Sequence, residues 1–144
     1  MTTEQTFNIF LVDDDPFYLA LLKQKLVSRG FENISSFTSG VDCLEHLSNK
    51  PDVIFLDHNM DTFTGYEVLK KIKRQDPNIF VVMISGQEDI KTAVDSLKHG
   101  AFDYILKAND DDHKIAEVLN KIQQVKELQR RKKRSFLKSI FSLV

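Results

Sequence analysis

Five polar residues end or directly follow short apolar runs, and their types suit the binding and transfer of a phosphoryl group. Asp13 and Asp14 follow one run, Asp57 and Ser85 each end another, and Lys107 follows a fourth. Carboxylate oxygens are the hard donors that Mg²⁺ prefers. A lysine ammonium and a serine hydroxyl both donate to phosphoryl oxygens. With Asp57 as a nucleophile, this set would support formation of an acyl phosphate.

Aspartates at strand ends also have a simpler interpretation, because they often cap the helix that follows. Asp15 before Pro16 fits that role, since its side chain can accept from free amides and proline at the first helical position loses no hydrogen bond. One strand-end aspartate alone would favour capping. Two acids, a third acid, a hydroxyl and a lysine at the ends of four runs favour a chemical site.

The apolar runs must lie side by side in one sheet for these residues to meet. The runs cover residues 7–12, 33–37, 53–57, 79–85 and 102–106, separated by helical patterns at about 16–30, 39–50, 66–74 and 89–99, with a last helix starting within 110–112. They predict an α/β fold with a doubly wound, five-stranded parallel sheet and helices on both faces. Ligands bind beyond the carboxyl ends of such strands. In the helix at 89–99, Ala93, Val94 and Leu97 are expected to face the sheet.

Four segments resemble the receiver domain of two-component response regulators. They are LVDDDP at 11–16, VIFLD at 53–57, MISG at 83–86 and GAFDYILK at 100–107. Each is short, but together they are specific, and the similarity covers about residues 7–124. The resemblance implies a (βα)5 flavodoxin-like, or CheY-like, fold and a single-domain phosphoprotein of a phosphorelay.

The resemblance also implies a phosphoacceptor and a metal site. Asp57 would take a phosphoryl group from the phosphohistidine of a sensor histidine kinase or a phosphotransfer protein. Asp13 and Asp14 would hold Mg²⁺, or Mn²⁺ in its place, with Asp14 and Asp57 as direct carboxylate ligands and the backbone carbonyl of Asn59 as a third. Apart from self-phosphorylation and self-dephosphorylation, no enzymatic activity is expected.

The remaining implied roles concern switching and the lifetime of the phosphoryl group. Ser85 and Lys107 would bind phosphoryl oxygens and draw in the loop after residue 85, and Tyr104 would swing inward as that loop moves. A half-buried strand aromatic is an equally good interpretation of Tyr104 on physical grounds. Asn59 and Gln87 fall where the family tunes self-dephosphorylation; both are uncharged and could orient a water molecule, which predicts a lifetime that is not unusually long.

One position departs from the family pattern directly after Lys107. Family members usually have proline there, where a cis peptide bond is favoured, and this chain has Ala108. A cis bond before a residue other than proline costs about 3–4 kcal/mol. The conformation of the Lys107–Ala108 bond is therefore open, although the role of the lysine is not.

The net charge of −1 hides two parts of opposite sign. Residues 1–113 carry 11 Lys/Arg and 19 Asp/Glu, whereas residues 114–144 carry 9 and 2. We therefore expect a receiver domain at 1–124 and a basic, amphipathic helical extension at 125–144. The extension has a basic run at 130–134, followed by apolar residues at helical spacing: Phe136, Leu137, Ile140, Phe141 and Val144.

Three uses of that extension are open: packing in a homodimer, docking on a partner, and contact of 130–144 with an anionic membrane surface. The receiver is expected to bind a downstream protein through the surface of its fourth helix, fifth strand and last helix. Direct nucleic-acid binding is not expected, because no helix-turn-helix or RNA-binding motif follows the receiver.

Composition restricts the class of protein further. The single Cys43 excludes a disulfide within the chain and a cysteine zinc cluster, and the first residues show no secretory pattern, so a cytoplasmic location is expected. A haloacid-dehalogenase-type phosphatase would need Asp-x-Asp-x-Thr/Val, which neither Asp13 nor Asp57 begins. Two alternatives stay open: a phosphorylation-independent adaptor with the receiver fold, and the receiver part of a larger regulator whose output domain is missing.

Overall fold

The computed structural model describes residues 7–60, 63–108 and 111–143. It has five strands, β1 Asn8–Val12, β2 Asn33–Phe37, β3 Val53–Asp57, β4 Phe80–Ser85 and β5 Asp103–Leu106. Between them lie α1 Pro16–Ser28, α2 Gly40–Glu45, the short 3₁₀ helix η1 Leu47–Asn49, α3 Gly65–Gln75 and α4 Ile90–Lys98, and α5 spans Asp111–Ser142. The chain divides into two compact units, Met1–Asp111, which contains the sheet, and Asp112–Val144, which contains α5 from its second residue onward.

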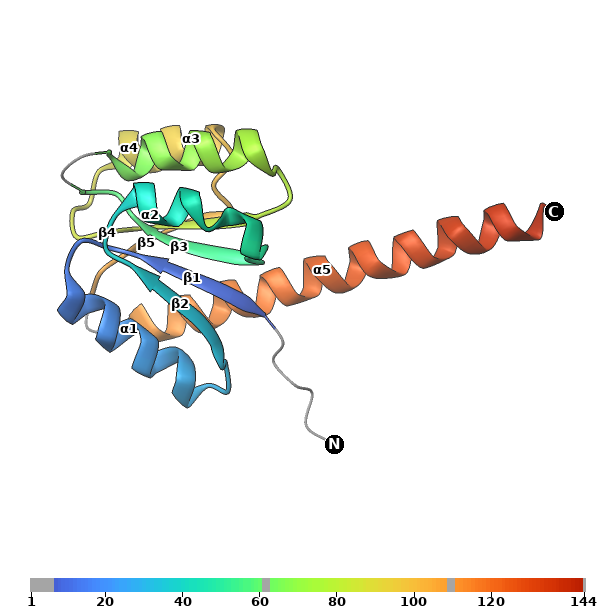
Figure 1. Cartoon of the computed structure of the whole chain (residues 1–144), viewed down its shortest axis with the longest axis horizontal. Helices are drawn as coiled ribbons and strands as arrows, with labels where there is room; N and C mark the ends of the chain where they lie inside the picture. Colours follow the sequence, from blue (N-terminus) through green and yellow to red (C-terminus); the bar gives the residue numbers. More distant parts are fainter. Residues whose placement is uncertain (1–6, 61–62, 109–110, 144) are drawn as a thin grey trace. The chain divides into compact units, whose positions relative to one another are not determined.

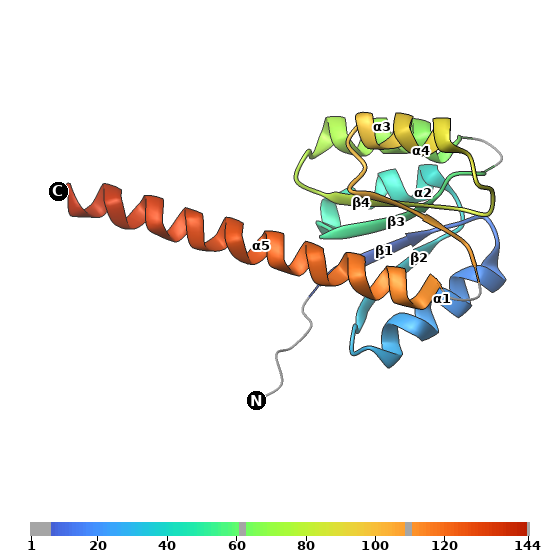
Figure 2. The same ribbon diagram turned by 180° about the vertical axis from the view of Figure 1, so that it is seen from behind.

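The strands form one parallel sheet in the order β2-β1-β3-β4-β5. Helices α2, α3 and α4 lie over one face of this sheet, and α1 lies on the other (Figures 1 and 2). The predicted doubly wound α/β fold is thereby confirmed. Its central strands are apolar on both faces because helices cover both.

The core between the sheet and helices α2 and α3 is made of buried aliphatic and aromatic side chains. Its members include Phe10, Val12, Cys43, Ile54, Leu56, Val68, Leu69, Ile72, Val81 and Met83. Helix α1 buries Leu19, Leu22 and Leu26. These contacts hold the strands rigidly, so the side chains at the strand ends are positioned by the core.

Helix starts agree closely with the sequence-based expectations. Asp15 caps α1, because its Oδ1 accepts from the Phe17 amide at 3.0 Å, and α1 ends before Gly30, which has a φ of 95°. Helix α5 begins at Asp111; the alternative start at Asp110, like Val144, lies outside the described residues. The helix expected at 39–50 is broken after Glu45 and resumes as η1, which is followed by Lys50 in a left-handed conformation.

The expected orientation of α4 is wrong for Val94 and Leu97, whereas Ala93, the third residue expected to face the sheet, is half-buried. Val94 and Leu97 are 42% and 47% exposed, whereas Ser96 is fully buried. Periodicity finds an apolar stripe on a helix but does not say which side of the helix faces the sheet. Here the small Ser96 lies against the body of the protein, and the apolar stripe, which includes Ile90, faces outward.

Candidate phosphorylation and metal site

The parallel sheet brings the predicted site residues to one edge. Asp57 and Ser85 are the last residues of β3 and β4, while Asp13 and Lys107 follow β1 and β5 closely. Ser85 pairs with Leu106 in register, and the Lys107 amide donates to the Ser85 carbonyl at 2.7 Å. The expectation that these ends gather is confirmed.

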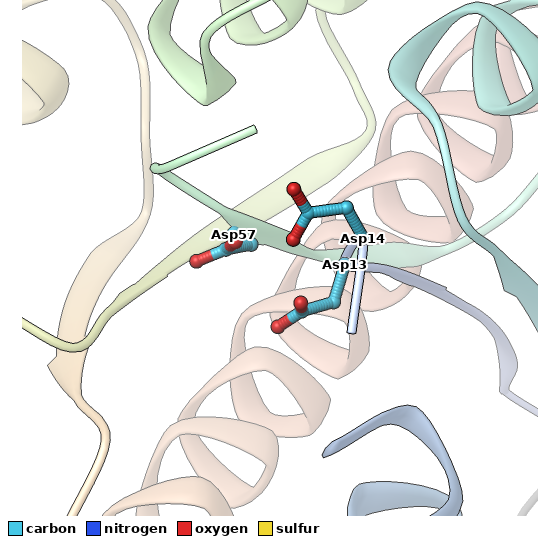
Figure 3. A group of neighbouring side chains, drawn as sticks. All are labelled: Asp13, Asp14 and Asp57. Atoms are coloured by element: carbon cyan, nitrogen blue, oxygen red, sulfur yellow. The ribbon is translucent and has the colours of Figure 1, made fainter. Parts of the chain in front are cut away.

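Three carboxylates form the acid cluster, which we define as Asp13, Asp14 and Asp57 (Figure 3). One oxygen atom from each lies within 4.8 Å of the others. Asp13 and Asp57 are buried and Asp14 is exposed, so the cluster opens to solvent on one side. Three converging oxygen donors with one accessible member fit a hard divalent cation that keeps part of its water shell.

Lys107 lies beside two members of the acid cluster. Its Nζ atom is 2.7 Å from Oδ2 of Asp13 and 3.4 Å from Oδ1 of Asp57. Burial acts to lower the pKa of this ammonium, but the hydrogen bond to Asp13 and the charges of Asp57 and Asp13 outweigh burial and raise the pKa. Lys107 therefore stays charged where it can meet an anion bound at Asp57.

Asp57 is held in an environment that disfavours its charge. Burial first, and then the neighbouring charge of Asp13, raise its pKa from 3.8 to about 6, against the lowering effects of Lys107 and of a backbone hydrogen bond from Asn59. One ammonium does not compensate two buried carboxylates. The excess negative charge is a second reason why the cluster fits a cation.

The backbone around Asp57 is fixed by close packing of the start of α3. The Gly65 amide donates to the His58 carbonyl at 2.9 Å, and the His58 amide donates to the Ile84 carbonyl at 2.9 Å. A Cβ atom at Gly65 would collide with the Asp57 carbonyl oxygen. Thr64 caps α3 by accepting from the Glu67 amide, so glycine at 65 lets a capped helix begin directly against the phosphoacceptor strand.

Ser85 and Gln87 are joined to one another. The Ser85 hydroxyl donates to the Gln87 carbonyl and accepts from the Gln87 amide, both at 3.2 Å. For this hydroxyl to donate to a phosphoryl oxygen, the hydrogen bond that it donates to the Gln87 carbonyl must break. Tyr104 packs half-buried against the core, and its hydroxyl is buried with no hydrogen-bond partner among the described residues.

Sequence reasoning missed Tyr18, which connects Lys107 to a second buried ion pair. The Lys107 ammonium lies 4.2 Å from the centre of the Tyr18 ring, and the Tyr18 hydroxyl donates to Oδ2 of Asp111 at 3.2 Å. Asp111 is buried and accepts from Lys25 at 2.6 Å. Burial and Asp111 raise the pKa of the Tyr18 hydroxyl, which stays protonated. The one sequence feature that could have indicated this role is the position of Tyr18 in the first turn of the helix after Asp13 and Asp14.

The structure answers one question that the sequence left open, while one predicted role stays a prediction. The Lys107–Ala108 bond is trans, as are all peptide bonds between described residues. A trans bond is the ordinary state when the second residue is not proline. Asn59 is exposed and its backbone contributes a hydrogen bond to Asp57, whereas metal binding by its carbonyl stays a prediction.

Comparison with known proteins identifies the family. The sequence model described as the response regulator receiver domain matches residues 9–123, and the chain belongs to that family. The transcriptional regulator NtrC of Escherichia coli K12 is 34% identical over 122 residues, which are 84% of this chain but only 26% of NtrC, so the chain spans about a quarter of that relative. The chemotaxis protein CheY of Thermotoga maritima is 28% identical over 81% of this chain and 97% of its own length.

Solved structures agree with this assignment. The crystal structure of a CheX–CheY–BeF3–Mg complex from Borrelia burgdorferi matches 81% of this chain and 88% of that chain, with a TM-score of 0.75 and 29% identity. The resemblance inferred from the four segments is confirmed. The protein is a receiver domain related to response regulators that include NtrC and CheY. This relationship is consistent with a phosphorylation-dependent signalling switch.

Proposed function

We propose that Asp57 accepts a phosphoryl group from the phosphohistidine of a histidine kinase or phosphotransfer protein. One observation carries the proposal: a buried carboxylate at a strand end shares its surroundings with two further carboxylates and with the Lys107 ammonium, 3.4 Å away. A cluster in which two buried carboxylates share one ammonium is costly to fold and is characteristic of functional sites.

The transfer step balances within this site. An oxygen of Asp57 attacks the phosphorus atom, the phosphorus–nitrogen bond breaks, and its electron pair stays on the donor imidazole. An imidazole that carries a proton on its other nitrogen leaves in the neutral form, and one without that proton takes a proton from water. Lys107 stabilises the charge on the phosphoryl oxygens. The Ser85 hydroxyl breaks its hydrogen bond to the Gln87 carbonyl and donates to one of these oxygens. The loop between β4 and α4, which this bond holds, is thereby displaced.

The acid cluster would hold Mg²⁺, or Mn²⁺, through Asp13, Asp14 and Asp57, with the Asn59 carbonyl as a further oxygen donor. Bound there, the cation would neutralise charge on the carboxylates and the transferred group. The family typically binds Mg²⁺ at an acidic pocket, and the Borrelia complex includes Mg and BeF3 with a CheY. Asn59 and Gln87 would set the rate at which water removes the phosphoryl group from Asp57.

The outward face of α4 supports a protein partner as the output. Ile90, Val94 and Leu97 are all exposed on this helix, which follows directly on the loop held by Ser85. A displaced loop would therefore change this apolar surface. We propose that a downstream protein, or a second copy of the chain, binds the surface of α4 and β5 in the cytoplasm. We propose no direct nucleic-acid contact and no turnover of a separate substrate.

The test is intact-mass measurement after incubation with acetyl phosphate and Mg²⁺. A mass gain of one phosphoryl group is expected in the unaltered chain and absent in Asp57→Asn. Asp15→Asn is the matched control, because it changes a nearby carboxylate while keeping a good helix cap. No gain in the unaltered chain would overturn the proposal in favour of a phosphorylation-independent adaptor, and a gain that persists in Asp57→Asn would overturn the assignment of the residue.

A further inference from the structure

The last described part of α5 has a charge composition unlike that of the rest of the chain. We define the basic tail as residues 130–143. It contains six Lys/Arg, at positions 130–134 and 138, and no Asp or Glu. Glu127, just before it, forms ion pairs with Arg130 at 3.0 Å and Arg131 at 3.2 Å. Among the described residues, no ion pair involves the other four cations, Lys132, Lys133, Arg134 and Lys138.

The basic tail also exposes large apolar side chains. Phe136 and Phe141 are 64% and 74% exposed, and Leu137, Ile140 and Leu143 are exposed as well. Because α5 is helical through Ser142, residues spaced three and four apart share a face. The apolar residues gather on one face, and the opposite face carries small or charged residues: Ser135, Lys138, Ser139 and Ser142.

Charge argues against pairing of this segment with a second copy of itself. Two basic tails side by side would bring twelve like charges together with no acidic residue to compensate them. The apolar seam is also interrupted, because Gln129 and Lys132 occupy positions where a coiled coil needs apolar residues. The surface that binds the basic tail must therefore supply both negative charge and an apolar interior.

We propose that the basic tail binds an anionic lipid surface, lying in the plane of the membrane interface. The helix would place Phe136, Ile140 and Phe141 at the boundary of the acyl chains and the basic residues at the headgroup phosphates. Its fourteen residues span roughly 21 Å along the surface at 1.5 Å per residue. No described helix is both long and apolar enough to cross the bilayer.

Vesicle co-sedimentation of the full chain tests this proposal. We expect binding to mixed phosphatidylcholine–phosphatidylglycerol vesicles, weak binding to phosphatidylcholine alone, and release by high salt. The triple variant Lys132→Gln/Lys133→Gln/Arg134→Gln should bind on the order of 100-fold more weakly. Phe136→Ser/Phe141→Ser should lose binding.

Ile90→Ser/Val94→Ser is the matched control, because it removes exposed apolar area from α4 and should leave vesicle binding unchanged. Equal binding to neutral and anionic vesicles, or none to either, would overturn the proposal. So would a tail-dependent dimer in sedimentation that excludes vesicle binding. Phosphorylation of Asp57, read by intact mass, is an independent outcome, so failure of either proposal leaves the other standing.

Discussion

Replacing Asp57 by asparagine should stabilise the cation-free protein, and the gain should grow with pH. The Asp57 carboxyl is 4% exposed, and burial followed by the charge of Asp13 raises its pKa from 3.8 to about 6. The folded protein therefore binds this proton more tightly than the unfolded chain does. The stability that the proton contributes is complete below pH 3.8 and is lost as the pH rises through about 6.

The magnitude follows from that difference in pKa. At about 1.4 kcal/mol per pH unit, a rise from 3.8 to about 6 makes ionised Asp57 cost about 3 kcal/mol at pH 7 and about 1.5 kcal/mol at pH 5. Asparagine has nearly the same shape and is neutral throughout. Asp57→Asn should therefore raise the free energy of unfolding by about these amounts, so the difference from the unaltered chain doubles over two pH units.

Urea unfolding followed by far-ultraviolet circular dichroism suits this chain, which has no tryptophan. The measurement is made at several pH values between 5 and 7.5 with a chelator present. Adding Mg²⁺ should reduce the difference between the two proteins, because a bound cation favours the ionised carboxylate. Asp15→Asn, with its cap preserved, should change the unfolding free energy by less than about 0.5 kcal/mol. A difference that does not vary with pH, or a less stable Asp57→Asn at pH 7, would refute the reasoning.

Substitutions at three positions and one labelling experiment test separate features of the structure. Tyr18→Leu should remove the ring beside Lys107 and slow phosphorylation by acetyl phosphate about two- to fivefold, while Tyr18→Phe keeps the ring and should stay within twofold. Gly65→Ala should lower the free energy of unfolding by about 2 kcal/mol or more in urea titrations, since its methyl group meets the Asp57 carbonyl. Asp14→Asn should abolish the rise in melting temperature that Mg²⁺ gives the unaltered chain. Burial raises the pKa of the Cys43 thiol to about 12, so a disulfide reagent should label it only after unfolding; rapid labelling of the folded chain would contradict this.

The strands and the gathering of the site residues could be predicted because both depend on local pattern. Runs apolar on both faces mark buried parallel strands, and parallel strands bring their carboxyl ends to one edge. The face of α4 could not be predicted, because Val94 and Leu97 form a stripe whose direction depends on how the helix docks. The break after Glu45 was also missed, because residues 41–50 contain neither glycine nor proline to mark the end of the helix.

The connection from Lys107 through Tyr18 to Asp111 could not be predicted from the sequence, because it depends on contacts between residues far apart in the chain. Tyr18 and Lys25 lie 93 and 86 positions before Asp111, and nothing in their local sequence refers to it. Only the docking of α1 brings them together. The consequence is physical: the ring that contacts Lys107 is held by a carboxylate at the first residue of α5. A shift of Lys107 toward a phosphoryl group on Asp57 would weaken its contact with the Tyr18 ring. The hydrogen bond between Tyr18 and Asp111 would then pass any displacement of the ring to the first residue of α5.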